Sequence, residues 1–446
     1  MKSRIIFFIA ALAVFSSPAN AQLFNTVRFY NPSCTTINSA SIVRVAPSNI
    51  EVVAYHSHGD VNEFYLIDDI NNNIVSRFKI PDRIHVFDFQ IVDDMVFFCG
   101  RTMSFAVVGH FPIQIFHNPA LQFKYYTSND LTYFKKMVAY PDPEPSFIQL
   151  EVIGDDSISP NTKNNVFSEF IYDPATDNII SSNYYSSGNV PLQQSFENYY
   201  QDGIFQDITV TKDYLVLSGW DYSYNNIYIT RFPKYAVLTG SVFKFDESGD
   251  PYTSSRIYME SLLNNDIVTA ATYIDPNNLP VGIRLRTIDV SLMTNTITQF
   301  VPLLEKTEPE DMLFMKEDQS LLLLQKSFYP TISDYQSVIY YLDPYNNSYV
   351  TDVLYNFDCS YYSLDRFTEP IYIAAGLTND YYHGYLMRYK PTYDMSCIDM
   401  GDIRIDPKNN SASSFFNPIY LNPLYIIQYT PPIYPDSEPI KVICPE

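Results

Sequence analysis

Short apolar segments of about six residues recur along the whole chain, each preceded by a polar turn and an earlier apolar stretch. Residues 87–100 (FDFQIVDDMVFFCG) and 206–219 (QDITVTKDYLVLSG) share one pattern, in which a Gly follows an Asp twelve residues later. Apolar and polar positions alternate on both sides of the turn, as they do in β-strands. The pattern therefore predicts a hairpin of two strands, A and B.

Eight segments of the B type occur, and their ends are spaced by 45 to 65 residues. Most are followed by an apolar strand that ends in a turn marked by Asp or Pro, such as EFIYDPATDNII (169–180), which predicts a second hairpin, C–D. Four strands in about fifty residues are typical of a propeller blade. The B segments are IEVVAY (50–55), MVFFCG (95–100), QLEVIG (149–154), YLVLSG (214–219), DIVTAA (266–271), SLLLLQ (320–325), IYIAAG (371–376) and LYIIQY (424–429).

The two ends of the chain each have a strand without a hairpin partner. Only IKVIC (440–444) follows the eighth A–B hairpin, and FNTVRFY (24–30) precedes the first. We expect residues 24–30 to be the outer strand of the last blade, beside the C-terminal strand, because this pairing removes an open sheet edge. The predicted fold is an all-β single β-propeller of eight four-stranded blades, closed by the N- and C-terminal strands. A seven-bladed ring with the tail packed outside is the alternative.

The repeat unit resembles the secreted propeller repeats of the YVTN and PQQ-like kind, chiefly in turns such as TIDVSLMTNTI (287–297). The resemblance extends over residues 22–446 and implies an architecture only. A single Trp excludes the repeated tryptophan motifs of PQQ enzymes and WD40 repeats, and the Gly-Gly pairs of kelch repeats are absent. No functional residue is carried over from these families.

Residues 1–21 have the features of a signal peptide. Lys2 and Arg4 precede the apolar run IIFFIAALAVF, and Ala-Asn-Ala at the end is a small-x-small cleavage site. We therefore expect an exported protein, periplasmic or extracellular, in which residues 22–446 form the propeller domain. No later apolar run is long enough to cross a bilayer, and a net charge of −22 disfavours nucleic acid and anionic membranes. We expect neither nucleic-acid binding nor membrane insertion.

The five cysteines include no C-x-x-C pair, which argues against a zinc or redox site. Export permits disulfides. We expect one between Cys34 and Cys444, which follow the two chain-end strands. A second is expected between Cys359 and Cys397, which we assign to the outer strands of consecutive blades. Cys99 lies in an apolar strand and is expected to be buried and unpaired.

The chain has none of the common catalytic motifs: no G-x-S-x-G elbow, H-E-x-x-H pair, Walker loop or G-x-G-x-x-G. One compact cluster of histidines and an acid, formed by His56, His58 and Asp60, could contribute ligands to a metal ion. Two or three ligands on one loop do not complete a site, and a polar B–C loop is the simpler interpretation. We expect neither a metal nor a cofactor.

The B–C and D–A loops of a propeller leave one face of the ring, and this face is free to vary. Residues 186–203 and the long stretch between Gly219 and Asp246 enlarge it beside the fourth blade, and both are rich in Tyr, Asn and Gln. We therefore expect a ligand site over the third to fifth blades. Its candidate residues are Trp220, Tyr222 and Tyr224 as apolar faces, Asp221, Gln193 and Gln194 as polar groups, Tyr199 and Tyr200 as a wall, and Tyr381 and Tyr382 farther round the ring.

Two classes of function fit this surface. Aromatic rings stack on sugars or on peptide side chains while amides and carboxylates orient them, which favours a non-catalytic recognition or scaffold propeller that binds a glycan or a peptide. The alternative is a propeller enzyme, a lyase or hydrolase acting on polysaccharide. A third interpretation needs no ligand, since the same aromatic side chains could simply pack the loops onto the ring. The sequence does not indicate an oligomeric state.

Overall fold

The structure is a computed structural model. It describes residues 24–29, 39–46, 51–58, 61–68, 73–81, 84–103, 105–118, 120–127, 132–143, 147–159, 162–186, 203–221, 226–235, 241–246, 257–274, 280–302, 307–316, 319–329, 334–345, 348–354, 359–366, 372–378, 384–389, 398–402, 404–405, 425–429, 433–434 and 441–443.

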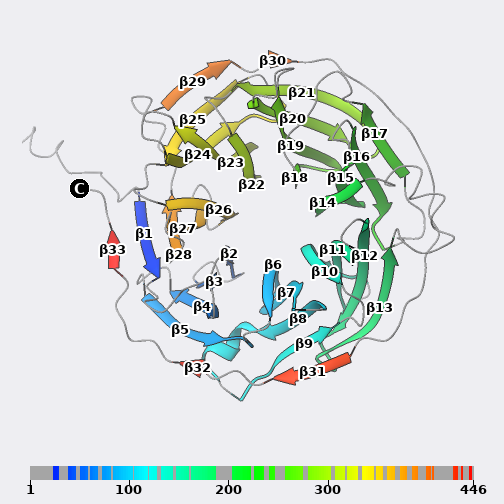
Figure 1. The fold of residues 1–446 in the computed structure, drawn as a ribbon, viewed down its shortest axis with the longest axis vertical. Helices are drawn as coiled ribbons and strands as arrows, with labels where there is room; N and C mark the ends of the chain where they lie inside the picture. The colour runs from blue at the N-terminus through cyan, green and yellow to red at the C-terminus, as the bar shows by residue number, and fades with distance from the viewer. Residues whose placement is uncertain are drawn as a thin grey trace, which may run out of the picture.

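The described strands form seven antiparallel sheets that radiate from a central axis as the blades of a β-propeller (Figure 1). The first strand of each sheet lies innermost, and the chain then steps outward strand by strand. Blade 1 contains β2 (Ser39–Val45), β3 (Glu51–His58), β4 (Val61–Asp68) and β5 (Asn73–Lys79). Blade 2 contains β6 (His85–Val92), β7 (Met95–Arg101), β8 (Ala106–Pro112) and β9 (Phe123–Thr127), with the 3-10 helix η1 (Ile113–Phe116) between the last two.

The next four blades repeat this order. Blade 3 contains β10 (Thr132–Pro141), β11 (Ile148–Ser159), β12 (Thr162–Asp173) and β13 (Asn178–Ser186). Blade 4 contains β14 (Gly203–Val210), β15 (Tyr214–Asp221), β16 (Asn226–Pro233) and β17 (Ser241–Asp246). Blade 5 contains β18 (Ile257–Ser261), β19 (Asp266–Ile274), β20 (Pro280–Asp289) and β21 (Thr294–Pro302). Blade 6 contains β22 (Thr307–Met315), β23 (Ser320–Tyr329), β24 (Asp334–Leu342) and β25 (Ser348–Leu354).

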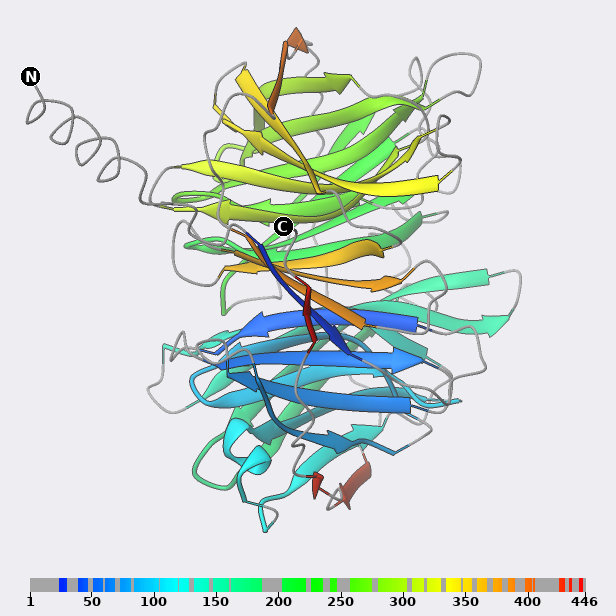
Figure 2. The same cartoon turned by 90° about the vertical axis from the view of Figure 1, so that its left-hand side faces the viewer.

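Blade 7 combines strands from both ends of the chain. It contains β26 (Cys359–Arg366), β27 (Tyr372–Thr378), β28 (Gly384–Tyr389) and then β1 (Phe24–Phe29), which pairs with β28 from Phe24↔Tyr389 to Phe29↔Gly384. The C-terminal strand β33 (Lys441–Ile443) pairs with the other edge of β1, with Val27 opposite Val442. Figure 2 shows β1 crossing between these neighbours. The innermost strands contact each other around the ring, and β26 contacts β2.

The C-terminal strands run around the outside of the ring and each adds a fifth strand to a blade (Figure 1). In chain order they join blades 6, 5, 2, 1 and 7: β29 (Ile398–Asp402), β30 (Arg404–Ile405), β31 (Tyr425–Tyr429), β32 (Ile433–Tyr434) and β33. We call this set of five strands the outer belt. The predicted eighth blade is therefore wrong, because its B segment is β31, the outer neighbour of β9, with Ile427 opposite Tyr125.

The hydrophobic core lies between the blades, so most central strands bury both faces. β7 has five consecutive buried residues, Val96 to Gly100, where alternation alone predicts every second one. Between blades 1 and 2 the core is mainly aromatic: the Phe64 ring lies 5.0 Å from Phe111 and 5.5 Å from Phe89. Cys99 lies in β7 and is fully buried and unpaired, as predicted.

The Asp and Gly of the repeat mark a β-bulge in the innermost strand. The A–B register shifts between Val86 and Asp88 in blade 2, and Gly100 lies opposite Val86. A Cβ on Gly100 would lie 1.9 Å from the carbonyl oxygen of His85, so only glycine fits. Blade 4 has the same shift between Phe205 and Asp207, with Gly219 opposite Phe205. The repeated Asp-to-Gly spacing is therefore the signature of a bulge.

The structure describes two of the five cysteines, Cys99 and Cys359. Cys359 is the first residue of β26, an innermost strand, so its predicted place on an outer strand is wrong. Cys34, Cys397 and Cys444 lie outside the described residues, as do residues 1–21 with the predicted signal peptide. Among the described residues no helix is long and apolar enough to cross a membrane.

Candidate functional site

The innermost strands surround a central channel that contains a cavity of about 400 Å³. Every blade contributes a charged side chain to its lining. Two of these side chains are cationic and five are acidic: Arg44, Asp88, Lys136, Asp207, Glu260, Asp311 and Asp365. Buried charges need partners, and most of these side chains bind groups of neighbouring blades.

Three of the acids make one repeated arrangement. Asp88, Asp207 and Asp311 each lie directly after a bulge, and Oδ1 of each accepts the N–H of the next residue at 2.9 Å. Oδ2 of each accepts an N–H from the innermost strand of the following blade. These second bonds run to Asp88 from Met137 at 3.1 Å, to Asp207 from Met259 at 2.7 Å and to Asp311 from Leu364 at 2.8 Å. Each carboxylate therefore ties one blade to the next.

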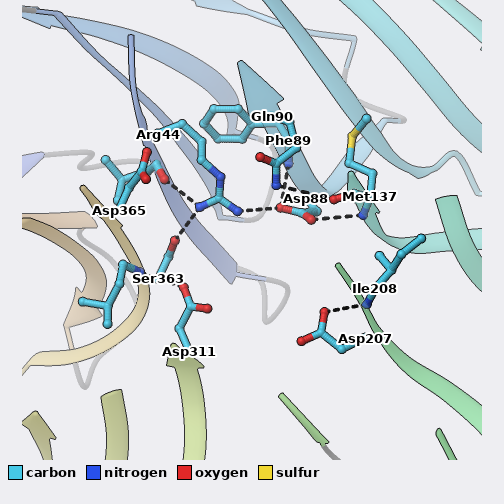
Figure 3. A network of polar contacts seen from close by, with 12 residues as sticks. Arg44, Asp88, Phe89, Gln90, Met137, Asp207, Ile208, Asp311, Ser363 and Asp365 are labelled. Atoms are coloured by element: carbon cyan, nitrogen blue, oxygen red, sulfur yellow. Dashed lines mark hydrogen bonds and ion pairs between the residues drawn. The ribbon is translucent and has the colours of Figure 1, made fainter. Parts of the chain in front are cut away.

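Arg44 performs the corresponding task in blade 1 (Figure 3). Its Nη2 donates to Asp88 of blade 2 at 2.9 Å, and its Nη1 donates to Ser363 of blade 7 at 3.2 Å. Burial lowers the pKa of Arg44, but Asp88 and the other channel acids raise it by a larger amount, so the net shift of the pKa is upward. Asp365 of blade 7 also accepts the N–H of Val45 at 2.6 Å. Blades 1, 2 and 7 are thus held together by one guanidinium and two carboxylates.

Lys136 occupies in blade 3 the position that Asp occupies in blades 2, 4 and 6, directly after a bulge. Its Nζ lies 5.8 Å from the centre of the Tyr258 ring, a cation–π distance. Burial lowers the pKa of Lys136, but Asp88, Asp207 and Asp311 raise it by more, so the ammonium stays charged. The lysine is the central counter-charge of the channel.

Two acids of the channel, Asp207 and Asp311, hold their protons more tightly than free carboxyls. Burial raises the pKa of Asp207 to about 6, although Lys136 and the two N–H donors act against the shift. Burial also raises the pKa of Asp311, against the opposing effects of Lys136 and Arg44. Since these carboxylate oxygens already accept backbone hydrogen bonds, the channel serves first to hold the blades in place. Within the described part of the chain, no group of His, Cys, Asp or Glu side chains is arranged to hold a metal ion.

A second cluster lies where the B–C and D–A loops leave blades 2 and 3. Phe87 is the bulge residue of β6, Arg101 ends β7 and Tyr133 is the second residue of β10. The Arg101 guanidinium carbon lies 5.6 Å from the Phe87 ring centre and 5.9 Å from that of Tyr133, and the two rings are 6.1 Å apart. Met103 and Phe105, in the adjoining B–C loop, are exposed. We call these five residues the rim cluster.

The polar neighbours of the rim cluster fix its geometry. The Tyr133 hydroxyl donates to Oδ2 of Asp155 at 2.6 Å, and Lys135 Nζ lies 2.6 Å from the same oxygen. Lys135 also lies 5.6 Å from the Tyr133 ring centre. Asp155 is buried, so the tyrosine ring is held by a carboxylate that solvent does not reach.

Most of the predicted ligand residues cannot be placed. Trp220 and Asp221 are the last residues of β15, with backbone opposite Ile204 and Gly203 at the B–C end of blade 4. The other candidates lie outside the described residues: Tyr222, Tyr224, Gln193, Gln194, Tyr199, Tyr200, Tyr381 and Tyr382. They remain predictions.

Of the weak metal candidates, His56 is buried within β3, His58 ends that strand and Asp60 lies outside the described residues. Sequence reasoning missed the rim cluster, although GRTM (100–103) was recognisable as a B–C loop. The available signal was Phe87, an apolar residue placed directly before the Asp of the repeat.

No protein-family model matches the chain, and no curated protein is significantly similar to it in sequence. Several solved structures are similar to it. One is titled as the structure of the Dos1 propeller, with 10% identity over 82% of this chain and 95% of that one and a TM-score of 0.44. Another is the β-propeller domain of the Trilobed protease from Pyrococcus furiosus, with 8% identity, coverage of 87% and 100%, and a TM-score of 0.39. A third is the dihydro-heme d1 dehydrogenase NirN, with 10% identity, coverage of 72% and 70%, and a TM-score of 0.33.

Proposed function

We propose that the protein is an exported, non-catalytic recognition or scaffold propeller that binds a glycan or a peptide on its B–C/D–A face. The rim cluster is the observation that carries this proposal. Phe87, Met103 and Phe105 are 36%, 82% and 39% exposed. Phe87 lies near the start of β6, and Met103 and Phe105 lie in the loop after β7, the strand that pairs with it. Grouped apolar side chains on a protein surface commonly mark a binding site.

The channel supports a scaffold role. Four of its five acids, Asp88, Asp207, Asp311 and Asp365, accept a backbone N–H from a neighbouring blade and so act as structural ties. The proposal that the protein is exported rests on the sequence of residues 1–21. A catalytic propeller acting on polysaccharide is the competing function, and it would show itself by releasing product.

We also infer that β1 closes the ring. Its ladder with β28 joins the N-terminal end of the chain to the last blade, while β26 contacts β2 on the channel side. A closed ring provides a rigid platform for loops on one face.

Glycan and peptide arrays test the function directly. We expect saturable binding without product by the wild type, and at least a tenfold loss of affinity in Phe87→Ala. Tyr235→Ala is the matched control, because Tyr235 is 43% exposed but follows β16 at the C–D turn of blade 4, on the opposite face. Equal binding by all three proteins would place the site elsewhere, and turnover of a polysaccharide would favour the enzyme.

A further inference from the structure

Arg101 is a surface guanidinium that its own neighbours leave available. Within the described residues it makes cation–π contacts with Phe87 and Tyr133 but no hydrogen bond or ion pair through its side chain. Other arginines do: Arg44 binds Asp88, and Arg77 lies 3.6 Å from Glu63. Because guanidinium N–H groups bind carboxylates in a two-pronged geometry, an exposed arginine held by two rings is prepared for an anionic group.

The site is held in place before any ligand binds. Tyr133 is fixed by its bond to Asp155, and the B–C loop is closed by Thr102, whose N–H donates to the Phe105 carbonyl at 2.7 Å. The Thr102 hydroxyl also accepts the N–H of Phe105 at 3.0 Å. A rigid site loses less conformational entropy on binding, which increases affinity.

The chemistry of the rim cluster favours a protein ligand over a sugar. Arg, Tyr, Phe and Met are the side chains enriched at protein interfaces, and Arg and Tyr are common among the residues that dominate binding energy. Sugar recognition needs carboxylates and amides beside the ring to bind hydroxyl groups, but the nearby Asp155 is buried and already bound to Tyr133 and Lys135. Met103, which is 82% exposed, adds a flexible apolar surface that suits an aliphatic side chain.

We propose that Arg101 binds the carboxylate of an acidic residue in a peptide segment of a partner protein, while a neighbouring apolar side chain of that segment packs on Met103 and Phe105. The inference rests on the proposed function and names its ligand class. A chain with a net charge of −22 repels acidic partners over most of its surface, so an acidic segment needs an available cation to bind. Arg101 supplies such a cation within the rim cluster.

His85 provides an internal reporter of the bound carboxylate. It lies opposite Arg101 in the β6–β7 ladder. Burial and then the charge of Arg101 lower its pKa, so the imidazole is neutral near pH 7. A carboxylate bound to Arg101 offsets that charge and raises the pKa of His85, which NMR titration of the ring protons can follow.

The test uses the full-length mature protein and an array of peptides in which Asp or Glu adjoins Leu or Phe, each beside its Asn or Gln analogue. Uronic-acid oligosaccharides form a second array. We expect micromolar binding of acidic peptides, at least a tenfold loss with the amide analogue and a similar loss in Arg101→Gln, and an upward shift of the His85 pKa on binding. Lys234→Gln is the control, because Lys234 also stacks on two aromatic rings but lies on the opposite face.

The outcomes separate the inference from the function it rests on. If Phe87→Ala abolishes peptide binding while Arg101→Gln and the amide analogues bind within twofold of their parents, the face binds ligand but the carboxylate inference is wrong. Binding of uronic acids alone assigns the site to glycans and overturns the peptide. Absence of binding to both arrays overturns both proposals. Only variants that melt at the same temperature as the wild type are compared. Arg101→Lys should bind more tightly than Arg101→Gln if charge is the main attraction.

Discussion

Single carboxylates in the channel determine how the blades are held, and Asp207 is the clearest of them. It is buried, accepts two backbone N–H groups from two blades and retains a pKa of about 6 against an ordinary value of 3.8. Between these values the folded state holds a proton that the unfolded state has released. The contribution of Asp207 to stability is therefore greatest below about pH 4 and falls as the pH rises to 6.

Asp207→Asn tests this directly. The variant cannot titrate and retains one acceptor oxygen, so it loses one buried hydrogen bond at a cost of about 1–3 kcal/mol. We expect the stability advantage of the wild type over the variant to shrink by about 3 kcal/mol between pH 4 and pH 7, at about 1.4 kcal/mol per pKa unit. Urea unfolding at four pH values measures it. Asp93→Asn, in an exposed turn, is the control, and a constant difference across the range would refute the assignment.

The cysteines give a second prediction at the level of single residues. Burial raises the pKa of the Cys99 thiol well above its ordinary value, so we expect it to resist alkylation at pH 8 until the protein unfolds. Non-reducing peptide mapping should find Cys99 free and Cys34 joined to Cys444. Free thiols at both Cys34 and Cys444 would exclude this disulfide.

At the level of elements, the bulge and its glycine form one unit. Gly154 repeats the relation of Gly100, since a Cβ there would lie 1.9 Å from the carbonyl oxygen of Tyr133. In blade 5 the corresponding residue is Ala271, and its A–B ladder has no register shift. Blade 6 has the same register shift, between Pro309 and Asp311, but Gln325 lies opposite Pro309. The close approach of the backbone therefore requires glycine at Gly100 and Gly154 and not at every bulge, whereas the regular ladder of blade 5 accepts alanine.

Gly100→Ala and Gly154→Ala should each destabilise the protein by about 2–3 kcal/mol, because the obstructing atom belongs to the backbone and cannot rotate away. Ala271→Gly is the matched control and should cost only about 0.5–1 kcal/mol. Thermal and urea unfolding measure all three. Equal costs at the three positions would mean that the bulge does not impose the glycine.

The strands and the blade order of much of the chain could be predicted from the sequence because alternation and turn residues are local signals. The Asp-to-Gly spacing was visible, but its meaning was not, since the N–H groups that Asp88 and Asp207 accept belong to the following blade. The prediction of an eighth blade was wrong for a related reason. An apolar strand such as β31 has the same sequence pattern whether it lies inside a blade or on its outer edge.

At the level of the whole molecule, β1 links the two ends of the chain. Six residue pairs join it to β28 and three join it to β33, whereas β32 pairs with β5 through two. Removal of residues 22–29 should lower the melting temperature strongly and promote aggregation, since the edge of β28 becomes open. Removal of residues 431–446, which deletes β32 and β33, should have the smaller effect. Circular dichroism and size-exclusion chromatography compare the two, and an equal loss of stability would contradict the central role of β1.

Because of the outer belt, the response of the molecule to a pulling force should depend on which end of the chain is pulled. A force applied to the C-terminus acts first on β33, then on β32 and β31, and each is attached along one edge by only three, two or five residue pairs. We expect these strands to detach one at a time, while the inner strands of every blade stay paired. A force applied to the N-terminus acts at once on β1, which is bonded along both edges. The same protein should therefore yield in small steps when pulled from one end and resist until it breaks open when pulled from the other.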